Sequence, residues 1–229
     1  MQPAVDSLSV YFDVTTFSLR GDRLDDYVDQ VRRALDVRQL DRAVICGVSF
    51  GGVVALRFAA AYPERTRALV LVSTPGPAWR LRPRHDVYAR WPRVFGPLFL
   101  AEAPWRLRKE LRATFSSRRD RRSYKQRVFR TFLSAPVSLR SMAARARMIE
   151  RASASDDCAR VTAPTLIVTG EPRLDHVVPV DGSSEYTRLI RGAQATTIER
   201  TGHLGSVTRS DVFAQLVRTF VEDHRDAAA

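Results

Sequence analysis

Ser49 stands in a pattern that can turn a serine into a nucleophile. The run Gly47–Gly51 fits G-x-S-x-G, in which a sharp turn between a strand and a helix presents the serine hydroxyl at its tip. The apolar residues 43–46 favour a buried strand, and the alanine-rich residues 53–61 favour a helix. The first turn of that helix would aim free N–H groups at an oxyanion near Ser49, with the N–H of Phe50 the nearest donor. The alternative is that Ser49 is an ordinary turn residue between glycines.

A serine nucleophile needs a neighbouring base, and His203 is the histidine placed to supply it. It comes directly after a predicted strand at 194–198. An acid to orient the imidazole is available in the loop after a predicted strand at 165–170, where Asp175 is preferred and Glu171 competes. We interpret the remaining histidines as structural or exposed, namely His85, His176 and His224.

The alternation of strand and helix patterns predicts a parallel sheet with helices on its faces. Short β-branched or apolar stretches are expected as strands at 14–19, 43–46, 68–73, 165–170 and 194–198. Apolar spacing and helix-forming composition predict helices at 22–35, 53–61, 182–190 and 212–221. In open parallel sheets functional groups gather at the carboxyl ends of the strands, which is where Ser49, Asp175 and His203 fall.

The three sites follow the chain order Ser, Asp, His, and with them the sequence resembles a known family. From about Val14 to the C-terminus it is similar to the α/β-hydrolase fold family, through Gly47–Gly52, Leu174–Pro179 and Gly202-His203. The resemblance implies an α/β fold, with a mostly parallel sheet flanked by helices. It also implies an all-helical cap inserted between the third and fourth predicted strands.

The resemblance further implies a role for each site residue. Ser49 would attack an acyl carbon, His203 would accept its proton and return one to the leaving group, and Asp175 would orient the imidazolium. A serine nucleophile favours acyl transfer, so we expect a small-molecule ester, lactone or related acyl substrate. Because the sequence has no Cys/His cluster and no H-E-x-x-H pattern, we expect neither a metal nor another cofactor.

Residues 77–160 are the predicted cap, inserted into a core formed by 1–76 and 161–229. They contain no convincing strand but several amphipathic helical patterns, one of which contains Tyr124, Val128, Phe129, Phe132 and Leu133. Trp79 and Phe99 are candidates to line an acyl pocket, although an aromatic side chain is more often part of a core.

All the excess positive charge of the chain lies in this predicted cap. Residues 77–160 carry 21 Lys and Arg against 7 Asp and Glu, a net charge of +14, whereas the rest of the chain has −2. Nearly all the basic residues are arginine, a bias that can arise from coding composition alone. The arginines could attract an anionic substrate. A second hypothesis is a catalytically impaired hydrolase-like protein that binds an anionic partner through Arg118–Arg122, although no nucleic-acid-binding motif accompanies that run.

One part of the family pattern has no counterpart in this sequence. Members normally begin with further strands, one of which ends in a His-Gly loop that supplies a second oxyanion donor, and the residues before Val14 contain neither His nor Gly. We expect either an N-terminally shortened form of a longer enzyme or a short protein that lacks part of the sheet. In both cases the sheet would have an exposed edge, which favours aggregation or a homodimer.

The composition fits a protein with one sizeable core. The chain has 229 residues, of which 45% are hydrophobic, and no apolar run approaches the ~20 residues that cross a bilayer. Its first residues lack a basic segment followed by an apolar one, so we expect a soluble cytoplasmic protein. Cys46 falls in a predicted core strand and is expected to be a buried, reduced thiol.

Overall fold

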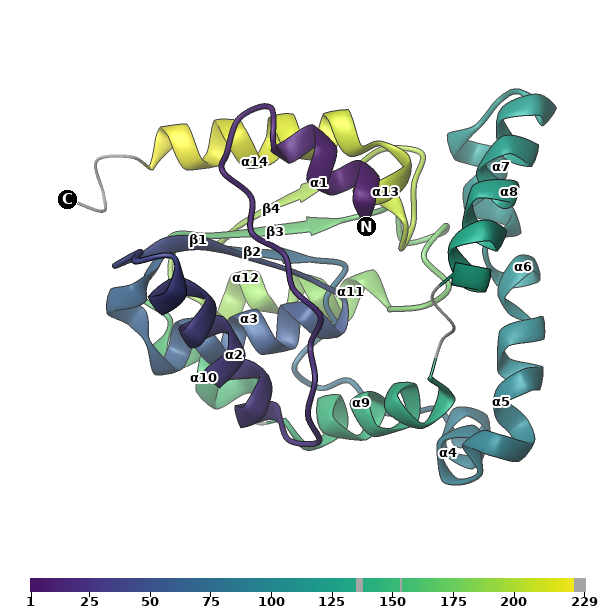
Figure 1. Ribbon diagram of the computed structural model, residues 1–229, viewed down its shortest axis with the longest axis horizontal. Coiled ribbons are helices and arrows are strands. Elements are labelled where there is room, and N and C mark those ends of the chain that lie inside the picture. Colours follow the sequence, from purple (N-terminus) through teal and green to yellow (C-terminus); the bar gives the residue numbers. More distant parts are fainter. Residues whose placement is uncertain (135–137, 153, 225–229) are drawn as a thin grey trace.

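A four-stranded parallel sheet forms the centre of the molecule (Figure 1). The computed structural model describes residues 1–134, 138–152 and 154–224. The strands lie in the order β1 (Ala43–Val48), β2 (Thr66–Val72), β3 (Thr165–Thr169) and β4 (Gln194–Thr197). Every neighbouring pair is parallel, which confirms the predicted α/β class.

The register of the strands brings their carboxyl ends to one edge of the sheet. Val48 of β1 pairs with Val72 of β2, Val72 pairs with Val168 of β3, and Thr169 of β3 pairs with Thr197 of β4. The sequences of β2 and β3 are apolar on both faces because helices cover both sides of these strands. The loops that follow the strands therefore open on the same side of the sheet.

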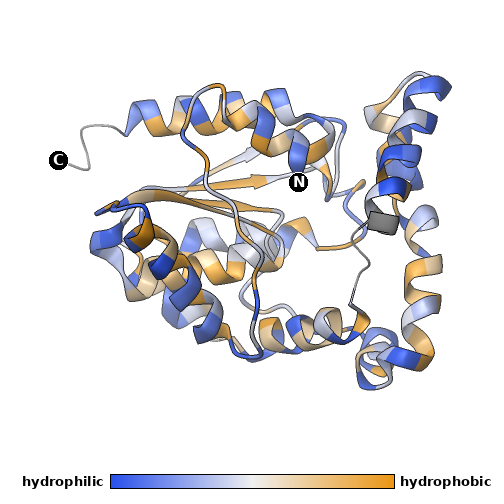
Figure 2. Cartoon of the chain, in the orientation of Figure 1, coloured by the Kyte–Doolittle hydropathy of each residue, from blue (hydrophilic) through white to orange (hydrophobic). Residues whose placement is uncertain are grey.

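Helices cover the two faces of the sheet, as Figure 1 shows. One face carries the terminal helices α1 (Gln2–Leu8), α13 (Gly205–Thr208) and α14 (Ser210–Asp223). The other carries α2 (Leu24–Val37), α3 (Phe50–Ala61), α10 (Ala154–Arg160), α11 (Val180–Ser184) and α12 (Tyr186–Leu189). A 3-10 turn, η1 (Pro63–Arg65), leads from α3 into β2. Figure 2 shows alternating hydrophobic and hydrophilic residues along α14, as expected of a helix with one buried side.

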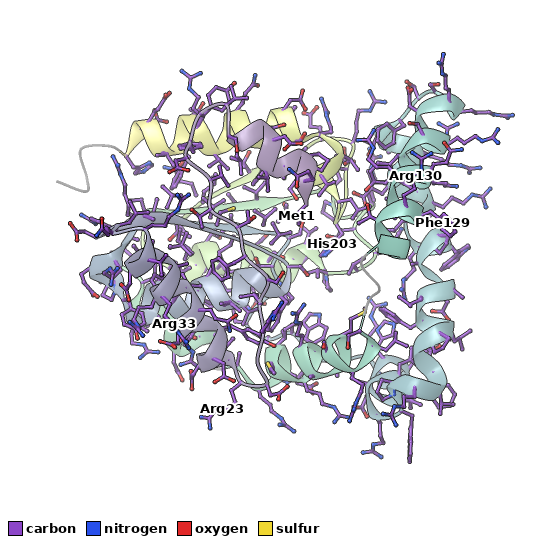
Figure 3. All side chains as sticks on the ribbon, viewed as in Figure 1. Met1, Arg23, Arg33, Phe129, Arg130 and His203 are labelled. Carbon is purple, nitrogen blue, oxygen red and sulfur yellow. The ribbon has the colours of Figure 1, made fainter. Side chains whose placement is uncertain are left out.

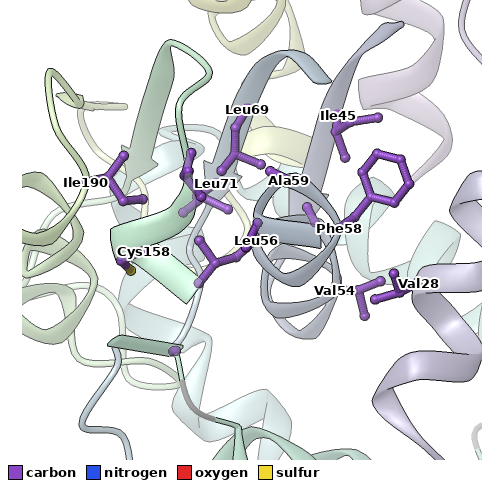
Figure 4. Close-up of a cluster of buried hydrophobic side chains, with 14 of the residues drawn as sticks. Val28, Ile45, Val54, Leu56, Phe58, Ala59, Leu69, Leu71, Cys158 and Ile190 are labelled. Carbon is purple, nitrogen blue, oxygen red and sulfur yellow. The ribbon is translucent and has the colours of Figure 1, made fainter. Parts of the chain in front are cut away.

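The larger of the two core clusters centres on α3. Its side chains Leu56 and Phe58 are fully buried and pack with Leu69 and Leu71 of β2 (Figure 4). Because α2 and α10 hold α3 against the sheet, α3 is buried around nearly its whole circumference, which explains an apolar sequence without a polar side. Cys158 of α10 belongs to the same cluster.

The strand predicted at 14–19 is wrong. Residues 13–21 form no strand, and none of their backbone groups is bonded to β1 in the described part of the chain. Helix α2 holds the segment instead, for example through Gln30 Oε1, which accepts from the N–H of Arg20 at 2.9 Å. A β-branched composition favours an extended backbone, but a strand also needs a hydrogen-bonded neighbour. Helix α1, which precedes this segment, is absent from the sequence prediction.

The chain between β2 and β3 forms a helical insertion. Its helices are α4 (Pro83–Arg90), α5 (Pro92–Ala101), α6 (Ala103–Arg106), α7 (Arg108–Thr114), α8 (Arg118–Ser134) and α9 (Leu139–Arg151), followed by α10. In Figure 1, α4–α8 stand opposite the carboxyl ends of the strands, and α9 packs beside α3. Residues 135–137 and 153, and the side chains of Phe132 and Leu133, lie outside what the structure describes. None of the described helices has the length and apolar composition of a membrane span.

Three side chains that the sequence places in packed elements lie on the surface. Val128 and Phe129 of α8 are 50% and 61% exposed, and Figure 3 shows Phe129 on the outer helices. A helical apolar pattern determines which residues share a face, but not whether another element covers that face. Cys46 is also exposed, so the prediction of a buried thiol is wrong. The reason is that β1 is an end strand, and the core cluster beneath α14 is built mainly from β2 and β3.

We predict that this chain self-associates through β1, because an end strand offers unpaired backbone groups to a second strand. Sedimentation velocity under reducing conditions should show dimers or larger species that increase with concentration. Cys46→Lys should shift the distribution toward monomer, since a charged side chain on an end strand opposes strand pairing. A wild-type chain that stays monomeric at every concentration would contradict the prediction.

Candidate active site

The strand, turn and helix predicted around Ser49 are present. β1 ends at Val48 and α3 begins at Phe50, and Ser49 lies between them with φ 54° and ψ −121°. A positive φ is strained for a residue that has a β-carbon. Two backbone hydrogen bonds hold Ser49 there: its N–H donates to the carbonyl of Val72 at 2.8 Å, and its carbonyl accepts from the N–H of Gly52 at 2.9 Å. The half-buried serine is thus fixed at the carboxyl end of β1.

Two glycines allow this turn to pack against its surroundings. A β-carbon on Gly47 would lie 2.2 Å from the carbonyl oxygen of Gly51, and one on Gly52 would lie 1.9 Å from Thr74 Oγ1. A β-carbon on Gly51 would meet nothing within 4 Å. Packing therefore requires the first glycine of the G-x-S-x-G pattern and Gly52, which lies just outside it, but not Gly51.

We predict opposite effects on stability for two neighbouring substitutions. Gly52→Ala should lower the free energy of unfolding by about 1–3 kcal/mol, because the added methyl group overlaps the buried Thr74 side chain. Gly51→Ala should leave it unchanged or raise it by up to ~1 kcal/mol, because alanine is the better helix former. Urea unfolding curves measure both values. Equal shifts for the two variants would contradict the packing described here.

Phe50 occupies the first position of α3, so its N–H has no acceptor within the helix. Its ring packs edge-on against Tyr27, with the centroids 5.4 Å apart, and the guanidinium of Arg145 lies 5.4 Å from the Phe50 centroid. These contacts hold the first turn of α3 next to Ser49. The N–H of Phe50 thereby remains available to a negatively charged oxygen.

Asp175 and His203 meet in the loops that follow β3 and β4. Asp175 Oδ2 lies 3.3 Å from His203 Nδ1. The other carboxylate oxygen, Oδ1, accepts hydrogen bonds from the N–H groups of Val177 and Val178, both at 2.9 Å. The side chains of Asp175 and His203 are 1% and 13% exposed, so little water competes for their contact. The two backbone bonds fix the carboxylate in the orientation that faces the imidazole.

Glu171, the competing acid, is engaged with other partners. Its Oε1 accepts from the N–H of Arg200 at 2.7 Å, and its Oε2 accepts from Arg173 Nε at 2.7 Å. These hydrogen bonds hold the pKa of Glu171 below its ordinary value. The structure therefore pairs His203 with Asp175 and not with Glu171.

Ser49 and His203 lie toward the same edge of the sheet but are not joined by a hydrogen bond. Each follows a strand at its carboxyl end, and Figure 3 shows His203 on the side of the sheet that faces the helical insertion. The hydroxyl of Ser49 has no hydrogen bond within the described residues. Hydrogen bonds of this kind are often loose without a substrate and shorten when one binds.

A basic cavity of about 720 Å³ opens beside Asp175. It lies between the loop after β3 and the helices of the insertion. Six Lys and Arg side chains line it against three Asp and Glu, and His85 and His176 line it too. Burial and the neighbouring arginines lower the pKa of His85, so its imidazole is neutral at pH 7. No described group of three or more His, Cys, Asp and Glu residues is arranged to hold a metal ion.

Neither of the two aromatic candidates lines this cavity. Phe99 lies on α5, edge-on to His85 with the ring centroids 5.8 Å apart, and the guanidinium of Arg106 lies 4.1 Å from its centroid. Trp79 is half-buried in the turn after β2, where its N–H donates to the carbonyl of Gly76 at 3.0 Å. Contact of Trp79 and Phe99 with a substrate stays a prediction.

Glu110 is a residue of this site that the sequence analysis missed. It lies on α7, is fully buried, and its Oε1 accepts hydrogen bonds from the N–H groups of Gly202 and Leu204, both at 2.8 Å. Burial raises the pKa of its carboxyl group. Glu110 is a single glutamate in an arginine-rich helical segment. Nothing in that local sequence indicates a contact with a loop 92 residues further along the chain.

Comparison with known proteins identifies the class. The model of the alpha/beta hydrolase family matches residues 3–216, so the chain belongs to this family and is a hydrolase. It is 29% identical to 2-hydroxy-6-oxo-2,4-heptadienoate hydrolase of Pseudomonas putida, over 86% of this chain and 70% of that protein. It is 28% identical to 2-hydroxymuconate semialdehyde hydrolase of Pseudomonas sp. strain CF600, over 90% of this chain and 70% of that protein.

A solved structure shares the fold. The meta-cleavage product hydrolase CumD of Pseudomonas fluorescens, in a serine-to-alanine mutant bound to acetate, aligns with a TM-score of 0.69 at 24% identity. The alignment covers 97% of this chain and 84% of CumD. The strand order and the helical layers described above are therefore those of an α/β-hydrolase fold.

Proposed function

We propose that this enzyme is a serine hydrolase of carboxylic esters, lactones or related acyl compounds. Ser49 is the nucleophile, His203 the base and Asp175 the acid that orients the imidazole. The observation that carries the proposal is the 3.3 Å approach of Asp175 Oδ2 to His203 Nδ1, with the carboxylate buried and held by two backbone N–H groups. A base with its orienting acid, at the same edge of the sheet as a strained serine that follows a parallel strand, provides the parts of a catalytic triad.

Each group has one step in the proposed reaction. Because Nδ1 of His203 faces Asp175, Nε2 is the nitrogen that takes the proton as Ser49 Oγ attacks the acyl carbon. The oxyanion of the tetrahedral intermediate forms beside the N–H of Phe50. His203 then protonates the leaving group, which departs and leaves an acyl-serine. Water, deprotonated by the same imidazole, releases the carboxylic acid and restores Ser49.

The basic cavity favours a substrate that carries a carboxylate. Its six Lys and Arg side chains create a local positive potential that concentrates anions. The names of both relatives, a heptadienoate hydrolase and a muconate semialdehyde hydrolase, denote compounds with a carboxylate group. We infer that residues 77–160 form a cap over the site, with α10 at their end packed against α3, and that this cap selects the substrate.

Covalent labelling with a fluorophosphonate tests the proposal. We expect a single adduct on the peptide that contains Ser49, and its loss in Ser49→Ala and His203→Ala. Asp175→Asn should slow labelling by roughly 10⁴-fold, because the imidazole loses its orienting acid. Glu171→Gln is the matched control and should label close to the wild-type rate.

Thermal unfolding establishes that each variant is folded before its labelling is compared. A folded wild-type protein that does not react would contradict the proposal. Equal slowing in Asp175→Asn and Glu171→Gln would contradict the choice of the acid.

A second candidate function is the binding of a polyanion by the insertion. A groove of about 480 Å³ between α7 and α8 has six basic residues and no acidic residue in its lining: Arg108, Arg112, Arg118, Arg121, Arg122 and Lys125. Arg121 Nη1 also donates to the carbonyl of Ser116 at 3.0 Å, so the groove wall is partly fixed. Side chains of this kind neutralise closely spaced phosphates and release the counterions that a nucleic acid binds.

Binding of a short single-stranded RNA at several salt concentrations tests this second candidate. The double variant Arg118→Ala/Arg122→Ala should reduce the slope of log affinity against log salt by about 1.4, because each of the two lost phosphate contacts contributes about 0.7 on a single strand. The matched control Arg23→Ala/Arg191→Ala removes two exposed arginines outside the groove and should leave the slope unchanged. If both pairs reduce the slope equally, the binding reflects net charge and not the groove.

A further inference from the structure

Glu110 connects the helical insertion to the loop of the candidate base. Its Oε1 accepts from the N–H groups of Gly202 and Leu204, the residues on either side of His203, at 2.8 Å each. One carboxylate oxygen thus fixes both peptide groups that bracket the histidine. The backbone on both sides of His203, whose Nδ1 faces Asp175, is therefore bonded to α7.

Other contacts between α7 and the same loop support this connection. Thr114 Oγ1 donates to the carbonyl of Arg200 at 2.9 Å, and Arg200 Nε donates to the carbonyl of Ala113 at 3.0 Å. These bonds hold the segment that leads into the loop but do not touch the peptide groups next to His203. They fix α7 against the loop, and Glu110 carries the contact to the histidine itself.

Burying the acidic side chain of Glu110 costs folding free energy, so a role in stability alone does not explain its position. The residue has no exposed surface, and its second oxygen, Oε2, has no hydrogen-bond partner within the described residues. An unpaired buried polar atom is destabilising, and such atoms in native proteins call for an explanation. Without Oε1, the N–H groups of the buried Gly202 and the half-buried Leu204 would also lose their acceptor. Because the hydrogen bonds of Oε1 go to this loop, we attribute the buried position of Glu110 to the loop and not to helix α7.

We propose that Glu110 is a positioning residue that holds His203 in its working geometry by accepting these two hydrogen bonds. The inference rests on the proposed function, because it assigns Glu110 a part in the reaction of Ser49. Glu110 does not line the basic cavity and so does not contact a substrate there. Its loss should slow the chemical step and leave substrate binding nearly unchanged.

The test compares three substitutions at Glu110 with one control on the same helix. Glu110→Leu keeps the volume but removes the acceptor, and Glu110→Asp keeps the charge but shortens the reach. Both should slow fluorophosphonate labelling of Ser49, and kcat for p-nitrophenyl acetate, by ten- to about a hundredfold, with KM little changed. Glu110→Gln retains an oxygen that can accept both bonds and should restore most of the rate. Thr114→Val removes a contact of α7 to Arg200 and should label at the wild-type rate.

Thermal unfolding separates a positioning role from a merely structural one. If Glu110→Leu lowers the melting temperature but the folded protein labels at the wild-type rate, the proposal is wrong. It is also wrong if Glu110→Gln is as slow as Glu110→Leu, since an acceptor would then not suffice. If Glu110→Leu does not fold, the labelling rates of Glu110→Asp and Glu110→Gln are compared instead. A wild-type protein that does not label at all contradicts the proposed function instead, so the two failures are distinguishable.

Discussion

The hydrogen-bonded register of the parallel strands is the constraint on which the whole site depends. Because β1 to β4 run in one direction with Val48, Val72 and Val168 aligned, the loop after each strand opens at the same edge of the sheet. The proposed nucleophile, acid and base come from three such loops that are far apart in the sequence. None of these groups stabilises the arrangement by itself. The burial of apolar side chains remote from the site, such as Leu69 and Leu71, holds the strands together.

The helical insertion contributes to the site in two ways. Basic side chains from its helices line the cavity beside Asp175, where we propose that they favour an anionic substrate. The carboxylate of Glu110 reaches from α7 to the peptide groups around His203, so the same insertion also bears on the position of the base. In the proposed mechanism, substrate choice and histidine geometry are linked through one helix, α7. We therefore expect a substitution in the insertion to alter the rate of the reaction without touching the sheet.

Sequence patterns predicted the parts of this enzyme that are continuous along the chain. The strand, turn and helix around Ser49 were predictable because a glycine pattern and an apolar run are local signals, and the loops of Asp175 and His203 were predictable from the strands before them. The strand expected at 14–19 is absent because a strand must pair with a neighbouring strand, and local composition does not show whether such a partner is available. The exposure of Cys46 depends on its strand's position at the end of the sheet. Glu110 was missed because its partners lie in a distant loop.

The most direct measurement is to quench the reaction with p-nitrophenyl acetate in acid and locate the acetyl group by mass spectrometry. The account predicts an acetyl group on the peptide that contains Ser49, formed at the rate of p-nitrophenol release. His203→Ala should remove both the acetyl group and the release. An acetyl group on another residue, or hydrolysis that persists unchanged in Ser49→Ala, would contradict the assignment of Ser49, His203 and Asp175 as the catalytic groups.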